Sequence, residues 1–420
     1  MIDFLKKQLF TVHQNGKQQV SEVFKYIGPG IIVTVGFIDP GNWAANLAAG
    51  ASYGYELLWV VTLSTIMLIL LQHNVAHLGI VRGQCLSECA YEFLPRYVSR
   101  FVLSTAGIAA AATALAEFIG AAIALKMLFG IPLLIGSVLT AIICTIMLIT
   151  NSYRKLERII AGFVSLIALA YLVEVNMVNV DWVAAGIGWV DPKVPNESML
   201  VILSILGAVI MPHNLFLHSE IIQSRQFNTQ DPSVMKRQLR YEFLDTLLSM
   251  GIGWMINSAM ILLAAAVFFA HGIEVTELEQ AEELLRPLIG PAAGTIFAIA
   301  LLFAGFASSA TAGMAGASIF AGMFGESYDM KDFHTRLGLA LTYIPALLLI
   351  VFVTDSFQAL LISQMFLSLQ LPITIFLQLY MTSSRKVMGQ YANHTYTNVL
   401  LWGIGIVVTV MNIYLLYVGA

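Results

Sequence analysis

Apolar stretches long enough to cross a lipid bilayer recur along the whole chain, separated by short polar segments. A membrane-spanning helix needs about 20 predominantly apolar residues, and a helix pairs its backbone polar groups internally, as the bilayer core requires. The pattern therefore predicts an all-α polytopic membrane protein with eleven transmembrane helices. The expected spans lie near residues 28–50, 57–80, 101–127, 131–150, 158–178, 199–223, 243–270, 290–322, 336–354, 357–382 and 397–419.

The composition agrees with this pattern and excludes an ordinary soluble protein. Of the 420 residues, 58% are hydrophobic and 11% are charged, whereas a soluble domain carries about 25% charged residues. The net charge is −4, and no long basic tract suggests a nucleic-acid partner. Cys85, Cys89 and Cys144 form no disulfide framework, so we expect three free thiols.

The distribution of lysine and arginine predicts the orientation of the chain. Loops on the cytoplasmic side of a membrane carry an excess of these residues. With a cytoplasmic amino terminus, 18 of the 21 lysines and arginines fall in cytoplasmic segments, and only Lys126, Lys193 and Arg286 fall outside. Changing the number of spans by one would scramble this partition. The count therefore supports eleven spans and an extracellular carboxyl terminus.

Two polar segments add to this topology. Residues 1–27 lack the apolar region and cleavage site of a signal peptide, so they are expected to form a cytoplasmic tail. The external loop 271–286 contains five glutamates, which either draw cations towards the outer mouth or are simply solvated. We expect the lipid bilayer as surroundings, no appended soluble domain and no obligatory protein partner.

Two spans are interrupted near their centres by a similar group of residues. The sequence DPGN occupies residues 39–42 in the first span, and MPHN occupies residues 211–214 in the sixth. Each group consists of a potential ligand, a proline, one further residue and an asparagine. Proline removes a backbone donor and breaks a helix. Either group alone would be explained by a helix kink.

The positions of the two groups predict an internal repeat. Breaks in the first and sixth of eleven spans fit two five-helix repeats of inverted topology, covering residues 28–178 and 199–382, followed by an additional helix at 397–419. In such architectures the broken helices present carbonyl groups and helix ends to substrate and ion near the bilayer midplane. The chain is therefore predicted to be a transporter.

The residues at the breaks predict a site for a divalent transition metal ion. Asp39 offers an anionic oxygen and Asn42 an amide oxygen, and the break before Pro212 frees a backbone carbonyl, which we assign to Ala208. Oxygen ligands alone suit Mg²⁺ and Ca²⁺, whereas the thioether of Met211 favours Mn²⁺, Fe²⁺ or Cd²⁺. Met211 is one of 18 methionines and stands out only through its place beside the break.

Other polar residues in the spans are candidates for proton transfer or further ligation. His213 and His218 are either proton acceptors or hydrogen-bonded structural residues. Glu117 would be protonated if it is buried without a partner, and we expect it to carry a proton. Gln364 either adds an amide oxygen to the site or supports helix packing. Asp39 and Glu117 are expected to be the two acids placed deep in the spans.

With these residues, the chain resembles the Nramp family of proton-coupled divalent metal transporters, in its bacterial manganese and iron form. The resemblance covers nearly the whole chain and implies a LeuT-like fold. Besides DPGN and MPHN, it rests on LLQHNVAHLGIVRG in span two, AEFIGAAIAL in span three, AGFASSATAGMAG in span eight and SQMFLSLQLP in span ten.

The resemblance also implies roles for individual residues. The implied metal ligands are Asp39, Asn42, the carbonyl of Ala208, Met211 and, in some conformations, Gln364. Proton transfer is implied for Asp39, His213 and Glu117, and Gln72 and His218 are expected to line the site. No resident cofactor is expected, because Mn²⁺ or Fe²⁺ binds as cargo and H⁺ as co-substrate.

Two positions depart from the family pattern. The family usually has an aspartate three residues before the glutamate of span three, where this chain has Ala114, and an arginine in span nine, where this chain has Leu339. Both partners of the expected exit pair for protons are missing, so coupling is expected to be looser or to use another path. The presence of Met211 argues against a related branch that moves magnesium and has a smaller residue there.

These observations predict a secondary transporter that imports Mn²⁺ and Fe²⁺, and also Cd²⁺ and Co²⁺, by alternating access with proton coupling, in the inner or plasma membrane of a bacterium. The alternatives are a metal uniporter with weak or absent coupling, a sodium-coupled symporter of an organic solute and, in a different class, a membrane metal sensor or scaffold. No nucleophile–base pair or nucleotide motif suggests an enzyme.

Overall fold

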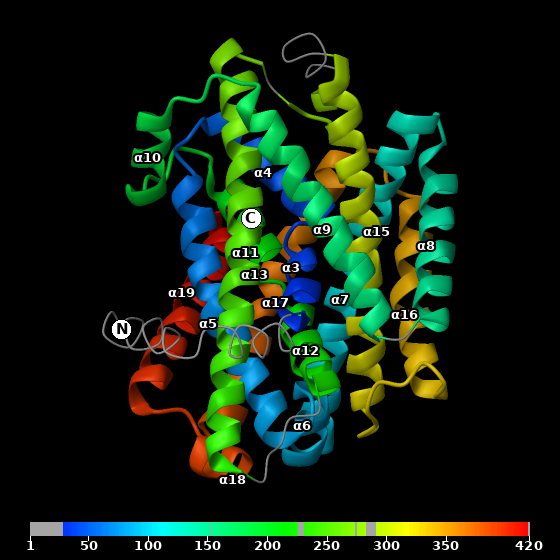
Figure 1. Cartoon of the computed structure of the whole chain (residues 1–420), viewed down its shortest axis with the longest axis vertical. Coiled ribbons are helices and arrows are strands. Elements are labelled where there is room, and N and C mark those ends of the chain that lie inside the picture. The colour runs from blue at the N-terminus through cyan, green and yellow to red at the C-terminus, as the bar shows by residue number, and fades with distance from the viewer. Residues whose placement is uncertain (1–27, 152, 226–230, 274, 283–290, 419–420) are drawn as a thin grey trace, which may run out of the picture.

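The apolar stretches form long helices in the computed structural model, which describes residues 28–151, 153–225, 231–273, 275–282 and 291–418. These residues contain helices and loops but no β-strand (Figure 1). The predicted tail, residues 1–27, lies outside the described part of the chain. The long uninterrupted helices are α5 (Leu58–Arg82), α7 (Arg96–Phe129), α8 (Leu133–Thr150), α9 (Tyr153–Asn176), α13 (Pro232–Val267), α15 (Pro291–Gly322), α16 (Phe333–Ile350), α17 (Ser356–Ser383) and α19 (Thr395–Val418).

The first and sixth spans are broken where the two proline-containing groups predicted. The first consists of α3 (Pro29–Gly36) and α4 (Pro40–Tyr53), and the sixth of α11 (Met199–Val209) and α12 (Pro212–Ile221). α4 and α12 each begin at a proline, which needs no backbone N–H in the first turn of a helix. The prediction of broken helices 1 and 6 is therefore confirmed.

The number of crossings depends on how the first span is counted. Ten helical stretches of the described residues are long enough and apolar enough to cross a membrane, and one of them, Met199–Ser224, contains the break of the sixth span. α3 and α4 have only 8 and 14 residues, so neither reaches across the bilayer alone. Eleven spans thus require α3 and α4 to form one interrupted crossing, and the number stays a prediction.

Several helices are longer than the apolar stretches from which they were predicted. α13 begins at Pro232 although its apolar stretch begins at residue 243, and α7 begins at Arg96 rather than at residue 101. Hydropathy detects the part of a helix inside the bilayer and misses polar turns that project from it. The loops also contain short helices that were not predicted: α6 (Leu86–Phe93), α10 (Trp182–Val190) and α18 (Arg385–Met388).

The helices at the rim of the molecule expose apolar side chains. α8 lies along one edge in Figure 1, and α10 and α19 lie on the opposite side. Ile146 of α8 and Ile413 of α19 are 55% and 60% exposed. Faces of this kind are unfavourable in water but match the acyl chains of a bilayer.

The interior contains more acidic residues than the sequence led us to expect. Asp39 and Glu117 are buried as predicted, but they are not the only deep acids. The further buried acids among the described residues include Glu174, Glu220, Glu242 and Asp245. Glu174 and Glu220 lie near the carboxyl ends of α9 and α12, and Glu242 and Asp245 lie within α13, at the beginning of its apolar stretch. The three cysteines are buried and free, as predicted.

Candidate metal centre

The two broken helices meet at their breaks, where backbone and side-chain oxygens converge. Asp39 precedes the first turn of α4, and its Oδ1 accepts a hydrogen bond from the backbone N–H of Asn42 at 2.8 Å. The side-chain Nδ2 of Asn42 donates to the same Oδ1 at 2.6 Å and to the carbonyl of Ala208 at 2.9 Å. Asn42 therefore joins the carboxylate of the first break to a freed carbonyl of the second.

A third helix, α17, reaches the same point through Gln364. Its Nε2 donates to Oδ2 of Asp39 at 3.4 Å. Two glycines make this approach possible: a Cβ atom at Gly41 would lie 1.7 Å from Nε2 of Gln364, and one at Gly207 would lie 2.0 Å from its backbone carbonyl oxygen. The structure thus brings together four of the predicted ligand residues, Asp39, Asn42, Ala208 and Gln364.

Two side-chain amide donors of this cluster face the Asp39 carboxylate. The amide Nδ2 of Asn42 and Nε2 of Gln364 point at the Asp39 carboxylate, while Oδ1 of Asn42 and Oε1 of Gln364 are buried without a partner among the described residues. Rotating either amide by half a turn would replace a donor by an oxygen. The arrangement can therefore offer carboxylate, amide and carbonyl oxygens to a metal ion without moving the backbone.

Met211 supplies the soft atom at the second break. It caps α12 and is fully buried, in contact with Ala109 and Leu367. Its Sδ accepts a weak hydrogen bond from Nδ2 of Asn214 at 3.8 Å. The thioether lies in the same break as the Ala208 carbonyl, three residues along the chain.

Two predicted proton-transfer residues flank this cluster. Glu117 of α7 lies close enough to Asp39 for the two carboxyl groups to interact, and Ser308 of α15 donates a hydrogen bond to its Oε2. His213 of α12 contacts Oγ1 of Thr113 through Nδ1 at 3.2 Å, and its Nε2 is buried without a partner in the described structure. Both residues thus connect the broken helices to α7.

Gln72 and His218 contact each other. Nδ1 of His218 and Oε1 of Gln72 are 2.9 Å apart, and both side chains are fully buried. The pair joins α5 to α12, and His218 follows Met211 by seven residues along the chain. Their predicted role in lining the metal site stays a prediction.

Three side chains that support the first break were not predicted. Asn257 of α13 donates to the carbonyl of Phe37 at 2.7 Å and accepts from Asn46 at 2.5 Å. The indole N–H of Trp43 donates to the carbonyl of Ile38 at 3.0 Å. These bonds satisfy carbonyls that the break frees. An amide in the middle of the apolar seventh span was the available signal for Asn257.

Asp245 of α13 is another supporting residue that was missed. Its two carboxylate oxygens accept the backbone N–H groups of Gly28 at 3.1 Å and Gly30 at 2.8 Å. The carboxylate therefore caps the amino end of α3, where backbone N–H groups lack partners within the helix. A single acid near the edge of an apolar stretch gave little indication of this distant contact.

The site is closed in this conformation. Asp39, Asn42, Met211 and Gln364 are all 0% exposed. On the side towards the carboxyl end of α4, the ring of Trp43 makes edge-to-face contacts at 5.0 Å with Tyr171 and with Phe297. Such ring pairs are favourable, and they hold Trp43, the residue after Asn42, in the buried core.

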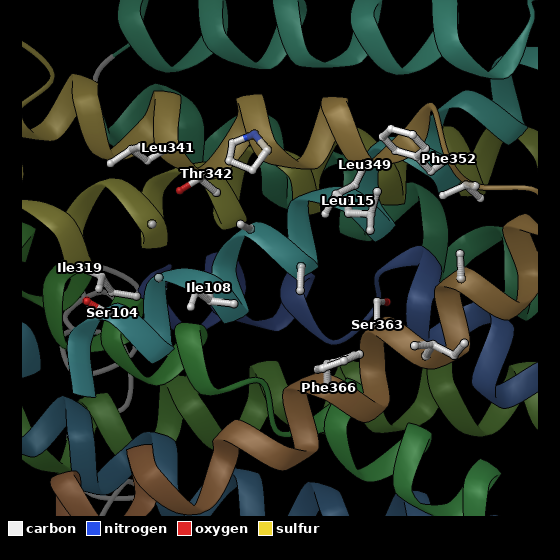
Figure 2. Close-up of a pocket in the computed structure, with 18 of the residues that line it drawn as sticks. Ser104, Ile108, Leu115, Ile319, Leu341, Thr342, Leu349, Phe352, Ser363 and Phe366 are labelled. Atoms are coloured by element: carbon white, nitrogen blue, oxygen red, sulfur yellow. The ribbon is translucent and has the colours of Figure 1, made fainter. Parts of the chain in front are cut away.

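The two positions that depart from the family pattern lie on α7, one helical turn before Glu117, and on α16. Ala114 of α7 and Leu339 of α16 are buried, and the two helices pack against each other. Next to them is a pocket of about 760 Å³, lined mainly by apolar side chains such as Ile108, Leu115 and Phe366 (Figure 2). Its lining includes none of the predicted ligands, but it includes Ser363, whose Oγ accepts a hydrogen bond from Nε2 of Gln364 at 3.4 Å.

Comparisons with known proteins find relatives along almost the whole chain. The family model described as natural resistance-associated macrophage protein-like, Nramp, matches residues 30–418. The divalent metal cation transporter MntH of Caldanaerobacter subterraneus subsp. tengcongensis is 36% identical over 404 residues, which cover 95% of this chain and 94% of that protein. The protein of the same name from Deinococcus radiodurans is 36% identical over 407 residues, with coverage of 96% and 92%.

Solved structures show the same architecture. The Eremococcus coleocola manganese transporter, in complex with an aromatic bis-isothiourea compound, matches with a TM-score of 0.80 at 27% identity, covering 96% of this chain and 88% of that one. Mhp1, a nucleobase-cation-symport-1 family transporter, matches with a TM-score of 0.62 at 15% identity, with coverage of 89% and 81%. At that identity the second likeness concerns the fold alone. The predicted all-α, LeuT-like fold is confirmed.

Proposed function

Because the chain belongs to the Nramp family, we propose that it is a secondary transporter of divalent transition metal ions, with Mn²⁺ and Fe²⁺ as its main cargo and Cd²⁺ and Co²⁺ as further substrates. The observation that carries this proposal is that the side-chain amide of Asn42 joins Asp39 to the Ala208 carbonyl, while Gln364 reaches the same Asp39 carboxylate from α17. One formal negative charge and several neutral oxygens lie at the junction of two broken helices. That junction is where transporters with broken helices bind substrate and ion.

The ligand types support the proposed choice of ion. Carboxylate, amide and carbonyl oxygens accept any hard divalent cation, including Mg²⁺ and Ca²⁺. Met211 adds a soft sulfur, which those two ions bind poorly and transition metal ions accept. We propose that Met211 shifts the preference of the site towards transition metals.

The closed site supports transport by alternating access. A site with all its ligand side chains buried must open alternately to the two sides of the membrane. The carboxyl ends of α5 and α12 lie at a face rich in lysine and arginine, and we propose that this face is cytoplasmic. We further propose that the carboxyl terminus is extracellular and that the membrane is the plasma membrane. An inside-negative potential then favours entry by about 2.3 kcal/mol per charge per 100 mV.

Proton coupling would depend on the acidic residues next to the metal site. The proximity of Glu117 to Asp39 offers a place where a proton can be exchanged when the metal binds or leaves. The apolar residues Ala114 and Leu339 offer no charge for carrying it further along α7 and α16. We therefore propose weak coupling to protons, with uniport as the limiting case.

Uptake of Mn²⁺ into proteoliposomes, with the internal pH recorded at the same time, tests both parts. We expect saturable uptake by the parent protein and its loss in Asp39→Ala, while Asp191→Ala, an exposed aspartate beside Lys193, leaves uptake unchanged. Saturable uptake by Asp39→Ala equal to that of the parent would refute the site. Any metal-dependent acidification in the parent should diminish in Glu117→Gln, and tight stoichiometric acidification would contradict weak coupling.

A further inference from the structure

A second group of metal-binding side chains lies between the candidate metal centre and the Lys- and Arg-rich face. It consists of His73 and His77 of α5, His218 of α12 and Glu242 of α13, and we call it the inner histidine cluster. His218 follows Met211 by seven residues, and His73 and His77 lie on the turns of α5 that lead to Arg82. None of these residues belongs to the cluster around Asp39.

His73 and Glu242 form the most direct contact of the cluster. Nδ1 of His73 and Oε2 of Glu242 are 2.5 Å apart, and the Glu242 side chain is fully buried while that of His73 is 32% exposed. Oγ1 of Thr246 donates to the other carboxylate oxygen at 2.7 Å. When Nδ1–H of His73 binds the carboxylate, Nε2 carries a free lone pair. A carboxylate behind an imidazole in this way is the usual support of a metal-binding histidine.

His77 lies one helical turn further along the same face of α5. Histidines four residues apart lie on the same face of a helix, and these two rings are nearly parallel, at 20°, with centroids 6.3 Å apart. No three ligand atoms of the inner histidine cluster lie within 4.8 Å of one another in the described structure, so a bound ion would have to draw these side chains together. Nε2 of His77 is buried and has no hydrogen-bond partner in the described structure. His77 is also within electrostatic reach of Glu242.

His218 contributes a third imidazole from a different helix. Because Oε1 of Gln72 can only accept a hydrogen bond, Nδ1 of His218 carries the proton in their 2.9 Å contact. Nε2 is then an acceptor, and it is buried without a partner among the described residues. His218 is within electrostatic reach of both His73 and Glu242. A buried acceptor that lacks a donor is costly unless a ligand satisfies it.

We propose that the inner histidine cluster is a second, transient binding station for divalent transition metal ions that pass between the candidate metal centre and the cytoplasm. This inference rests on the proposed function and extends it to the inner part of the route. Imidazole accepts ions such as Fe²⁺, Co²⁺ and Zn²⁺, and it is a poor ligand for Mg²⁺ and Ca²⁺. The imidazole nitrogens of this station would therefore favour transition metal ions over Mg²⁺ and Ca²⁺, as the sulfur of Met211 does at the first site. Glu242 acts as a positioning residue for His73.

Binding of Co²⁺ to the purified full-length protein tests the proposal, because both sites should accept this ion and its X-ray absorption fine structure reports imidazole ligation. We expect Asp39→Ala to remove one bound ion and leave the signal of imidazole ligation. The double variant His73→Gln/His77→Gln should remove that signal and leave the other ion. Glu242→Gln should lower the affinity for the imidazole-bound ion about 10–100-fold, as loss of an outer-shell partner does.

Two further variants keep the test decisive. Nε2 of His77 has no hydrogen-bond partner in the described structure, so His77→Gln breaks no bond there and the protein should fold. The variant should still bind the imidazole-bound ion more weakly. His334→Gln serves as the matched control, because His334 also pairs with a glutamate, Glu326, at 2.8 Å but lies outside the cluster. It should leave both bound ions and the absorption unchanged.

The outcomes separate this proposal from the proposed function. If the double histidine variant keeps the full complement of Co²⁺ and the same absorption, the inner station is refuted while the site at Asp39 stands. If Asp39→Ala changes nothing and the double variant abolishes binding, the proposed function fails instead. Loss of the second ion in Cys85→Ser would assign it to Cys85, Glu88 and Glu220, whose ligand atoms lie within 4.8 Å of one another, and would overturn the proposal.

Discussion

The breaks in spans one and six share a proline and an asparagine but present different chemistry. The first break presents the carboxylate of Asp39, held by the backbone and side chain of Asn42. The second presents the neutral carbonyl of Ala208 and the thioether of Met211. The negative charge of the site comes from the first span, and its soft sulfur atom comes from the sixth. We infer that affinity and selectivity are divided between the two halves of the site.

The two breaks also differ in how well their polar groups are satisfied. In the first, Asn257 and Trp43 bind the freed carbonyls of Phe37 and Ile38. In the second, Nε2 of His213 and Oδ1 of Asn214 are buried without partners in the described structure, as is Oδ1 of Asn42 in the first, and no side chain outside the site binds its freed carbonyl. A break whose freed backbone carbonyls are bonded by supporting side chains is held in one shape, whereas side-chain atoms without partners are available to an ion, a proton or water. The first break is therefore the fixed side of the site.

Replacing Met211 tests the division between charge and softness most strongly. Met211→Ala removes the sulfur and keeps every oxygen, so we expect the preference for Mn²⁺ over Ca²⁺ to fall about tenfold, equivalent to about 1.4 kcal/mol. Competition by Ca²⁺ in Mn²⁺ uptake measures the change. Met314→Ala, which truncates another fully buried methionine, controls for lost packing. Equal weakening of discrimination in both variants would show that sulfur ligation is not responsible.

Replacing Asn257 tests whether the first break is the fixed side. Asn257→Ala leaves the carbonyl of Phe37 without this donor and the amide of Asn46 with only a weak bond to Sδ of Met260, and an unsatisfied buried group costs about 1–3 kcal/mol. We expect a lower unfolding temperature together with weaker Mn²⁺ binding. Asn412→Ala, which removes a buried amide bonded to the carbonyls of Ser368 and Val408, should lower stability alone. Unchanged Mn²⁺ affinity in Asn257→Ala would mean that its hydrogen bonds do not shape the site.

The sequence predicted the parts of this site that depend on local chemistry. A proline inside an apolar stretch breaks a helix wherever the helix packs, so both breaks could be located from residues 39–42 and 211–214 alone. Their supports could not, because Asn257 and Asp245 act across more than 200 residues and are recognised only once α13 packs against α3 and α4. The histidines on α5 escaped notice for the same reason, since Glu242 is 169 residues away from His73.

The smallest expected effect comes from a second Asp-Pro pair, which separates the helix-capping role of Asp39 from its metal-binding role. Asp231 precedes Pro232 at the start of α13, as Asp39 precedes Pro40 at the start of α4, and it accepts the backbone N–H of Ser233 at 2.8 Å. Asp231 is exposed, outside the membrane, and the bonds from the hydroxyl and N–H of Ser233 lower its pKa. It therefore caps a helix without facing a metal site.

Because the pKa of Asp231 is lower in the folded protein, its contribution to stability is present above the ordinary aspartate pKa of about 3.9 and is lost as the pH falls through the folded value. Asp231→Ala should therefore lower the unfolding temperature slightly at neutral pH, and the difference from the parent should shrink in acid. Mn²⁺ uptake at neutral pH should not change. A loss of uptake comparable to that of Asp39→Ala would mean that capping, rather than ligation, explains the importance of Asp39.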